Sequence, residues 1–336
     1  MADGRDAPLS GPRPWSLAWR SARSFWPEGP GIAGPAAHFR TATHVGPVLA
    51  QALLALLREV DARLDHPAEL DVVDVGAGGG ELLAGLLAQA DPSLAPRLRL
   101  VGVDLLPRPA DLDPRIAWIE AAAPESVPPV RGLLVAHEWL DELPVDVVAL
   151  DDDGVLRTVL VDGDGTESLG GPASAGSVTW VDRWWGGLAA GDRAEAGTAR
   201  DSAWRACVSR VSAGTALAVD YGHVRAERES GRYAAGTLTG YRDGHTVAPC
   251  ADGSANLTAH VAMDSLAAQV LGGTAYPPVR QREALQALGV SAALPDLALA
   301  RSDPDGYADA LALASQASEL LDPAGLGAFW WLRHDV

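Results

Sequence analysis

The chain has 336 residues, of which 48% are hydrophobic, so it is long enough to bury the core of one large domain or of two small ones. Its formal net charge is -18 and its pI is about 4.7. A surface this acidic repels phosphate backbones and argues against nucleic acid as a partner; it suits a basic, arginine-bearing partner, although solubility alone also explains it. All 26 basic residues are arginine, which excludes a lysine nucleophile or a Schiff base.

The two cysteines, Cys207 and Cys250, are too few for a metal cluster. Neither they nor His245 and His260 have the spacing of zinc ligands, so we expect no metal site. The first residues lack the apolar core of a secretory signal, and no stretch approaches the ~18 apolar residues that span a bilayer. We therefore expect a reduced, cytoplasmic protein without a membrane span.

The first half of the chain predicts a flap followed by alternating helices and strands. Residues 1–44 are rich in Gly, Pro and Trp and are expected to form a partly irregular N-terminal flap. Leucines at helical spacing predict a helix over 45–64. Short apolar, partly β-branched runs predict strands at 71–75, 97–104, 115–120 and 132–138, with a helix at 81–90. This order indicates a parallel sheet with right-handed crossovers.

The second half predicts additions to this sheet. Residues 145–162 read as a hairpin around the turn DDDG, and the Gly- and Ser-rich residues 163–178 as a loop. Residues 222–262 are expected to be an insertion over the edge of the sheet. Further predictions are helices at 198–212, 263–271, 280–288 and 304–321, and strands at 214–221 and 327–333.

The glycine-rich stretch DVGAGGG at 74–80 stands where a predicted strand turns into a predicted helix. A turn this sharp needs residues without a Cβ atom, and it lets a ligand approach the backbone at the carboxyl edge of the sheet. Asp104 ends the next strand, where a carboxylate can accept both ribose hydroxyls of a nucleoside; alternatively it only caps a turn. The candidate nucleoside-binding residues are Gly76, Ala77, Gly78, Gly80 and Asp104.

The residue after the glycines bears on which nucleoside binds. Dinucleotide-binding proteins have a small residue here, so that a pyrophosphate reaches the helix N-terminus, whereas Glu81 would repel it. The pattern D-x-G-x-G-x-G resembles the first motif of S-adenosylmethionine methyltransferases, whose cofactor carries a sulfonium cation and no phosphate. A nicotinamide oxidoreductase is therefore the weaker alternative.

A second polar group, AHEWLDELP at 136–144, follows the predicted strand 132–138. Three acids in five residues form a negative rim beside the expected crevice. Because a guanidinium presents five donors that match carboxylates, Glu138 could orient an arginine and make one of its nitrogens nucleophilic. Alternatively, these acids stabilise the first turn of a helix; Asp141 fits either interpretation, and Glu142 is expected to be solvated.

A third group, Asp220-Tyr221-Gly222-His223, ends the predicted strand 214–221. Asp220 and Tyr221 could line the same crevice, and His223 could act as a base. The alternative is a strand cap with a packed tyrosine.

Together these motifs resemble those of the MidA-like methyltransferases, a family that includes a mitochondrial assembly factor for respiratory complex I that methylates protein arginine. The resemblance covers roughly residues 31–333. AHEWLDELP resembles the signature A-N-E-x-x-D-x-L-P, and Asp220-Tyr-Gly matches D-Y-G. Segments 38–41, 236–242 and 256–261 resemble the family's F-x-T, G-T-L-x-x-Y/F and D-I/L-T-A-H-V motifs. The chain departs from the family at His137, which replaces an Asn, at Asn256, which replaces an Asp, and after Thr41, where the family's Pro-Glu is missing.

The resemblance implies a Rossmann-like α/β fold with a mostly parallel, seven-stranded-type sheet over 45–336. It implies S-adenosyl-L-methionine as cofactor and direct SN2-type methyl transfer to a protein arginine. The expected cofactor-binding residues are Thr41, Gly76, Ala77, Gly78, Gly80, Asp104, His137 and Glu138, and the expected catalytic residues are Glu138, Asp141 and Asp220. The departures leave open a non-catalytic adenosylmethionine-binding assembly factor and a methyltransferase acting on a small molecule. The oligomeric state is not predicted.

Overall fold

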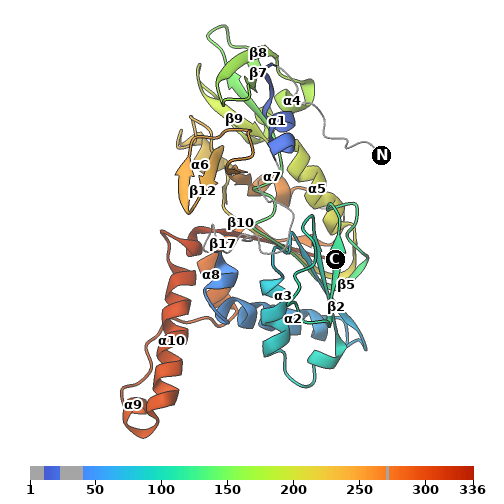
Figure 1. The fold of residues 1–336 in the computed structure, drawn as a ribbon, viewed down its shortest axis with the longest axis vertical. Coiled ribbons are helices and arrows are strands. Elements are labelled where there is room, and N and C mark those ends of the chain that lie inside the picture. The colour runs from blue at the N-terminus through green and yellow to red at the C-terminus, as the bar shows by residue number, and fades with distance from the viewer. Residues whose placement is uncertain (1–10, 23–40, 270–271) are drawn as a thin grey trace. The chain divides into compact units, whose positions relative to one another are not determined.

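The computed structural model describes residues 11–22, 41–269 and 272–336. The chain divides into two compact units, and Figure 1 labels their elements. Unit 1 comprises Met1–Pro27, Glu142–Arg200 and Val224–His260; unit 2 comprises Glu28–Asp141, Asp201–His223 and Val261–Val336. Most of the expected flap, including His38, Phe39 and Arg40 of the N-terminal motif, lies outside the described residues.

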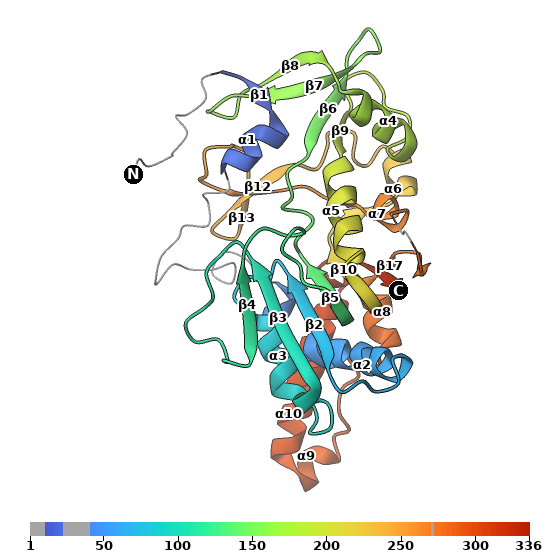
Figure 2. The same ribbon diagram turned by 90° about the vertical axis from the view of Figure 1, so that its right-hand side faces the viewer.

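The larger sheet belongs to unit 2 and, within the described residues, has eight strands in the order β16-β18-β10-β5-β2-β3-β4, with β17 also pairing with β18. Figure 2 shows β4, β3, β2 and β5 side by side. The strands are β2 (Leu70–Val75), β3 (Leu98–Asp104), β4 (Ile116–Glu120), β5 (Val130–His137), β10 (Val211–Asp220), β16 (Thr274–Ala275), β17 (Val279–Arg280) and β18 (Trp330–Asp335). A further short pair joins β11 (Gly222–His223) to β15 (Val261–Ala262).

The parallel part of this sheet follows the sequence prediction. Strands β10, β5, β2, β3 and β4 pair in parallel, as near-continuous apolar runs predict for strands covered on both faces. At the edge beyond β10, two short strands share the outermost position of the sheet. β18 runs antiparallel to β10, and β16 and β17 each pair with one part of β18, so that one long strand supports two short ones.

Helices of unit 2 cover both faces of the sheet. One core joins α2, α3 and α8 to alternate strand residues such as Leu133, Leu217 and Trp331. On the opposite face, Trp204 of α5 donates a hydrogen bond to His334 of β18 at 3.1 Å. The helices are α2 (Val48–Arg63), α3 (Glu81–Gln89), α5 (Thr198–Val208, which begins in unit 1), α7 (Met263–Ala267), α8 (Gln281–Ala287), α9 (Leu299–Ser302) and α10 (Pro304–Leu321), with 3-10 turns η3 (Ala42–His44), η4 (Ala95–Arg97) and η5 (Leu326–Ala328).

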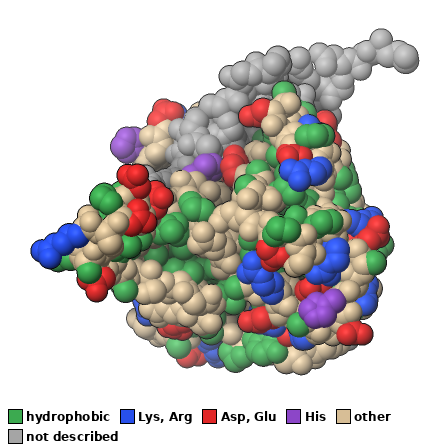
Figure 3. Space-filling model, turned by 90° about the horizontal axis from the view of Figure 1, so that it is seen from below, with side chains coloured by type: hydrophobic (Ala, Val, Ile, Leu, Met, Phe, Trp, Pro, Cys, Tyr) green, Lys and Arg blue, Asp and Glu red, His purple; other side chains and the backbone are tan. Residues whose placement is uncertain are grey.

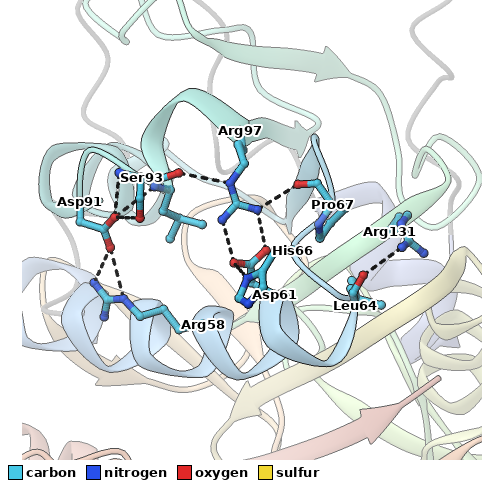
Figure 4. A network of polar contacts seen from close by, with 10 residues as sticks. Arg58, Asp61, Leu64, His66, Pro67, Asp91, Ser93, Arg97 and Arg131 are labelled. Carbon is cyan, nitrogen blue, oxygen red and sulfur yellow. Dashed lines mark hydrogen bonds and ion pairs between the residues drawn. The ribbon is translucent and has the colours of Figure 1, made fainter.

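The C-terminal end of α2 is fixed by the polar network of Figure 4. Asp61 is buried and accepts two hydrogen bonds of 2.7 Å from Arg97, while His66 Nδ1 lies 2.8 Å from the same carboxylate. These bonds lower the pKa of Asp61 to about 2, the hydrogen bond from Arg97 being the largest cause. Arg58 and Asp91 form a second, exposed pair at 3.2 Å. The buried pair therefore anchors α2 to the chain that enters β3.

Exposed leucines gather in the segment that contains α9 and α10. Leu294 and Leu297 are 76% and 73% exposed, and Leu311 and Leu313 are exposed as well. α10 packs only its C-terminal half, through Ala314, Ala317 and Leu320. Figure 3 shows hydrophobic side chains interspersed with acidic and basic ones on one face of the molecule. No helix among the described residues has both the length and the hydropathy needed to cross a membrane.

Unit 1 contains, among its described residues, a five-stranded sheet of order β1-β7-β6-β9 with β8 beside β7, and a three-stranded sheet of order β13-β12-β14. Its strands are β1 (Arg13–Pro14), β6 (Asp146–Leu150), β7 (Leu156–Val161), β8 (Glu167–Pro172), β9 (Arg193–Ala196), β12 (Thr239–Arg242), β13 (His245–Val247) and β14 (Asn256–Thr258). Its helices are α1 (Trp15–Ala22), α4 (Ala175–Trp184) and α6 (Arg225–Glu229). β6 and β7 form the predicted antiparallel hairpin.

Two segments of unit 1, residues 163–178 and 15–22, have more regular structure than was predicted for them. Residues 163–178, predicted to be a loop, contain β8 and the start of α4. β8 forms because β7 supplies backbone partners for its Gly-rich sequence, and α4 begins where the Ser174 side chain accepts the Ser177 N–H at 3.1 Å. Residues 15–22 form α1, whose buried Trp15 and Trp19 pack with Val147 of β6.

Candidate functional site

The glycine turn between β2 and α3 bends through left-handed backbone at Gly76, Gly78 and Gly80, whose φ angles are +74°, +56° and +79°. The N–H groups of Gly76 and Ala77 both donate to the Val103 carbonyl oxygen, at 2.9 and 3.3 Å. The turn is therefore tied to the end of β3. A Cβ atom on Gly76 would lie 2.6 Å from Trp139 Cδ1, and one on Gly80 would lie 2.8 Å from Leu112. Glycine is required here by both conformation and space.

Asp104, at the end of β3, is bonded to the same turn. Its Oδ2 accepts the Gly78 N–H at 2.9 Å, and its Oδ1 accepts the Leu106 N–H at 2.8 Å. The indole of Trp118 donates to the Leu106 carbonyl oxygen at 3.0 Å, so an aromatic side chain from β4 lies next to this strand end. The sequence analysis predicted Asp104 but not Trp118.

Asp74 is a third acid at the turn and was not among the predicted site residues. It is buried at the end of β2, only 3% exposed. The pKa of its carboxyl is raised to about 8, chiefly by burial and in smaller part by the charges of Asp104 and Glu81. At neutral pH the Asp74 carboxyl is therefore protonated. Its place two residues before Gly76 in the motif was the signal that could have identified it.

Thr41 is connected to the glycine turn through a chain of side chains. Its Oγ1 lies 2.6 Å from His44 Nδ1 and 2.7 Å from Thr43 Oγ1. His44 Nε2 lies 3.5 Å from Glu81 Oε1, and Glu81 Oε2 accepts the Gly79 N–H at 3.1 Å. The structure thus places the predicted Thr41 at this site and adds His44, which the sequence analysis did not predict.

Glu138 occupies the turn that follows β5, in an uncommon backbone conformation. Its φ is +52°, in the left-handed region that strains a residue with a long side chain. Its N–H donates to the Val219 carbonyl oxygen of β10 at 2.8 Å. The next residue, Trp139, lies against Gly76. The strand order changes direction between β2 and β5, so the glycine turn and Glu138 flank the switch point where α/β sheets bind ligands.

His137 is buried beside Glu138, its Nδ1 lying 3.5 Å from Glu138 Oε1. The pKa of His137 is lowered to about 4, chiefly by burial and in smaller part by the electrostatic interaction with His44. The imidazole is therefore neutral at physiological pH. A neutral histidine adds no positive charge beside the carboxyl group of Glu138.

Asp141, in the turn after β5, and Asp220, at the end of β10, were both predicted to be catalytic, and both are buried. Asp220 Oδ2 accepts the N–H groups of Leu140 and Asp141, at 3.0 and 3.2 Å. The Tyr221 hydroxyl donates to Asp141 Oδ2. Both carboxylates therefore make contacts that shape the turn, and Glu138 is the more exposed acid, with 20% of its side chain accessible.

The segments 236–242 and 256–260, which resemble two further family motifs, lie in unit 1 and form a polar cluster there. Glu195 of β9 is buried and accepts hydrogen bonds from the N–H groups of Thr237 and Leu238, at 2.7 and 3.2 Å. Asn256 donates to Glu142 Oε1 at 2.5 Å, so Glu142 is not simply solvated as expected. All residues predicted to be catalytic or to bind the cofactor belong instead to unit 2. Among the described residues, no three His, Cys, Asp or Glu side chains are grouped to hold a metal ion.

Comparison with known proteins gives a family and a fold. The profile of the family "Putative S-adenosyl-L-methionine-dependent methyltransferase" matches residues 48–275. A COG1565 superfamily protein from Burkholderia thailandensis, crystallised with S-adenosyl-homocysteine, has a TM-score of 0.77 and 24% identity over 97% of this chain and 88% of its own. A native COG1565 superfamily structure from the same organism has a TM-score of 0.74 and 25% identity over the same shares, 97% and 88%. No curated protein matches the chain significantly.

Proposed function

The chain belongs to the family of S-adenosyl-L-methionine-dependent methyltransferases, and we propose that it methylates a guanidinium nitrogen of arginine in a protein. The observation that carries the proposal is the Glu138 carboxylate, held at the switch point beside the glycine turn and next to a neutral His137. A guanidinium matches a carboxylate in charge and in the geometry of its donors.

The residues of the glycine turn fit the cofactor. The turn keeps its left-handed shape because glycine stands at Gly76 and Gly80, where Trp139 and Leu112 leave no room for a Cβ atom. Asp104 is placed to accept ribose hydroxyls, and acids at the turn suit a ligand that carries a sulfonium cation and no phosphate. The residues that would hold the cofactor are Thr41, Gly76, Ala77, Gly78, Gly80, Asp104 and His137. When bound, the cofactor supplies an electrophilic methyl group on sulfur.

The protein's contribution is positioning and electrostatics. Glu138 accepts an N–H of the guanidinium and localises its charge, so that the lone pair of another nitrogen is directed at the methyl carbon. The new C–N bond forms as the C–S bond breaks, and the proton leaves the methylated nitrogen for solvent. The products are a methylarginine and S-adenosylhomocysteine.

Incubation of the purified protein with S-adenosylmethionine and arginine-containing peptides tests the proposal, with mass spectrometry to detect added methyl groups. Glu138→Gln keeps the shape of the side chain and removes its charge. It should lower kcat by about 100-fold or more, the scale of losing one preorganised electrostatic contact, with little change in cofactor Kd.

Other outcomes would assign a different function. Methylation of a small amine but of no peptide would show that the methyl acceptor is a small molecule and not a protein arginine. Cofactor binding without any transfer would favour the adenosylmethionine-binding assembly factor. A Glu138→Gln variant that chiefly loses affinity for S-adenosylmethionine would show that Glu138 binds the cofactor's amine.

A further inference from the structure

The turn 138–141 is bonded at three places to three consecutive residues at the end of β10. The Val219 carbonyl oxygen accepts the Glu138 N–H at 2.8 Å. The Asp220 carboxylate accepts the N–H groups of Leu140 and Asp141. The Tyr221 hydroxyl donates to the Asp141 carboxylate. The end of β10 therefore contacts the turn through main chain, carboxylate and hydroxyl in succession.

Tyr221 is itself braced from two directions. Its ring meets Phe329 edge-on, with centroids 5.5 Å apart. Its carbonyl oxygen accepts the Val261 N–H of β15 at 3.1 Å. One residue further along, the Gly222 carbonyl oxygen accepts the Trp330 indole N–H at 3.0 Å. A tyrosine held in this way presents its hydroxyl to Asp141 from a fixed position.

These contacts explain how Glu138 keeps its left-handed conformation. A non-glycine residue persists there only where the surroundings over-determine it, and such residues cluster at functional sites. Extended or right-handed backbone at Glu138 would re-aim its side chain and move Trp139 away from Gly76. The bonds to Asp220 and Tyr221 oppose both changes.

We infer that Tyr221 and Asp220 are positioning residues that hold the strained turn 138–141, so that Glu138 points its carboxylate at the methyl acceptor. This inference rests on the proposed function of Glu138. It gives Asp220 a role through the backbone of the turn instead of direct contact with substrate. It also joins the D-Y-G motif to the A-H-E-x-x-D segment in one structural unit, because Asp141 of the A-H-E-x-x-D segment accepts the hydrogen bond of the Tyr221 hydroxyl in the D-Y-G motif.

Tyr221→Phe removes the hydroxyl and keeps the ring. The matched control is Tyr276→Phe, because the Tyr276 hydroxyl also donates to a carboxylate of unit 2, Asp335, at 3.1 Å. Hydrogen exchange of the full chain, followed by mass spectrometry, should show faster exchange over 137–142 in Tyr221→Phe only. The kcat for the methyl acceptor should fall by about tenfold or more, the scale of one lost bond to a charged group, while the cofactor Kd stays within about twofold.

A double-mutant cycle separates positioning from general destabilisation. If Tyr221 acts through Glu138, adding Tyr221→Phe to Glu138→Gln should cost no further kcat. Multiplicative losses, or unchanged exchange over 137–142, would overturn the inference. The exchange measurement needs no turnover, so it still decides whether the turn is held if no arginine peptide is methylated and the proposed function fails. Asp141→Ala removes the acceptor of the Tyr221 hydroxyl, so it should also speed exchange over 137–142 and replaces Tyr221→Phe if that variant does not fold, whereas Asp141→Asn keeps an oxygen for the hydroxyl and should retain slow exchange.

Discussion

Replacing Asp104 by Ala removes the carboxylate on which the ribose assignment depends. In the structure this carboxylate accepts the Gly78 N–H at 2.9 Å and the Leu106 N–H at 2.8 Å, which fixes its orientation at the end of β3. The variant therefore loses the acceptor for the ribose hydroxyls and, in addition, the bond that ties Gly78 to the strand end. Both losses act on the same part of the cofactor site.

The size of the effect follows from the kind of bond that is lost. A hydrogen bond to a charged group contributes about 1.5–3 kcal/mol, so the Kd of S-adenosylmethionine should rise about 10- to 150-fold. Asp104→Asn should fall at the lower end of this range, because one oxygen remains. Its amide N–H₂, however, would face a backbone N–H donor at either Gly78 or Leu106.

Isothermal titration with S-adenosylmethionine and with S-adenosylhomocysteine measures the effect. The two ligands share the ribose, so Asp104→Ala should weaken them by the same factor. Asp91→Ala is the matched control, because Asp91 Oδ1 also accepts two backbone N–H groups, those of Ser93 and Leu94, at 3.0 Å each, but in the network of Figure 4. Unchanged affinity in Asp104→Ala, or an equal loss in the control, would refute the assignment.

Three further substitutions test the turn and the fold. Gly76→Ala should weaken S-adenosylmethionine binding about tenfold or more through backbone strain and contact with Trp139. Gly154→Ala, at the same φ of +74° but in open space, should leave the affinity unchanged. An equal change in cofactor Kd in the two variants would contradict this prediction. The pKa of the Asp74 carboxyl is about 8 in the folded protein and 3.8 in the unfolded chain. The free energy of unfolding of the wild type should therefore fall as the pH rises from 3.8 to about 8, and that of Asp74→Asn should not show this fall. The gap between their unfolding temperatures should therefore widen up to about pH 8 and then level, and a constant gap would refute the assignment. Asp61, with a pKa lowered from 3.8 to about 2, should contribute about 2 kcal/mol at neutral pH that is lost as pH falls toward 2; urea unfolding of Asp61→Asn should show this loss at neutral pH and none near pH 2.

The parallel strands and long helices were predictable because their signal is local and repeated. β2 and β5 are continuous apolar runs, and α10 begins at Pro304 with Asp303 as its cap, as the sequence pattern indicates. β8 was missed because ESLGGP has little strand character of its own, and its register comes from β7. Residues 15–22 were predicted only as part of the partly irregular segment 1–44, and the helical spacing of Trp15, Ala18 and Trp19 was the signal for α1.

The same distinction applies to the candidate site. The glycine turn and Asp104 form contiguous or regularly spaced motifs, so sequence alone could propose them. The bond between Tyr221 and Asp141 joins residues 80 positions apart, and its existence depends on the pairing of β5 with β10. The left-handed backbone at Glu138 and the neutral state of His137 likewise arise from tertiary packing, which no local pattern encodes.

The division of the chain into units has a consequence for how the protein could have evolved. Unit 1 is built from three separate segments, and within residues 41–269 the chain passes between units after Asp141, Arg200, His223 and His260. The first passage falls inside AHEWLDELP, the third directly after Asp220-Tyr-Gly-His, and the last inside Asn256-Leu-Thr-Ala-His-Val. Unit 1 therefore cannot be gained, lost or exchanged as a cassette at one junction, and several of its junctions would interrupt the motifs.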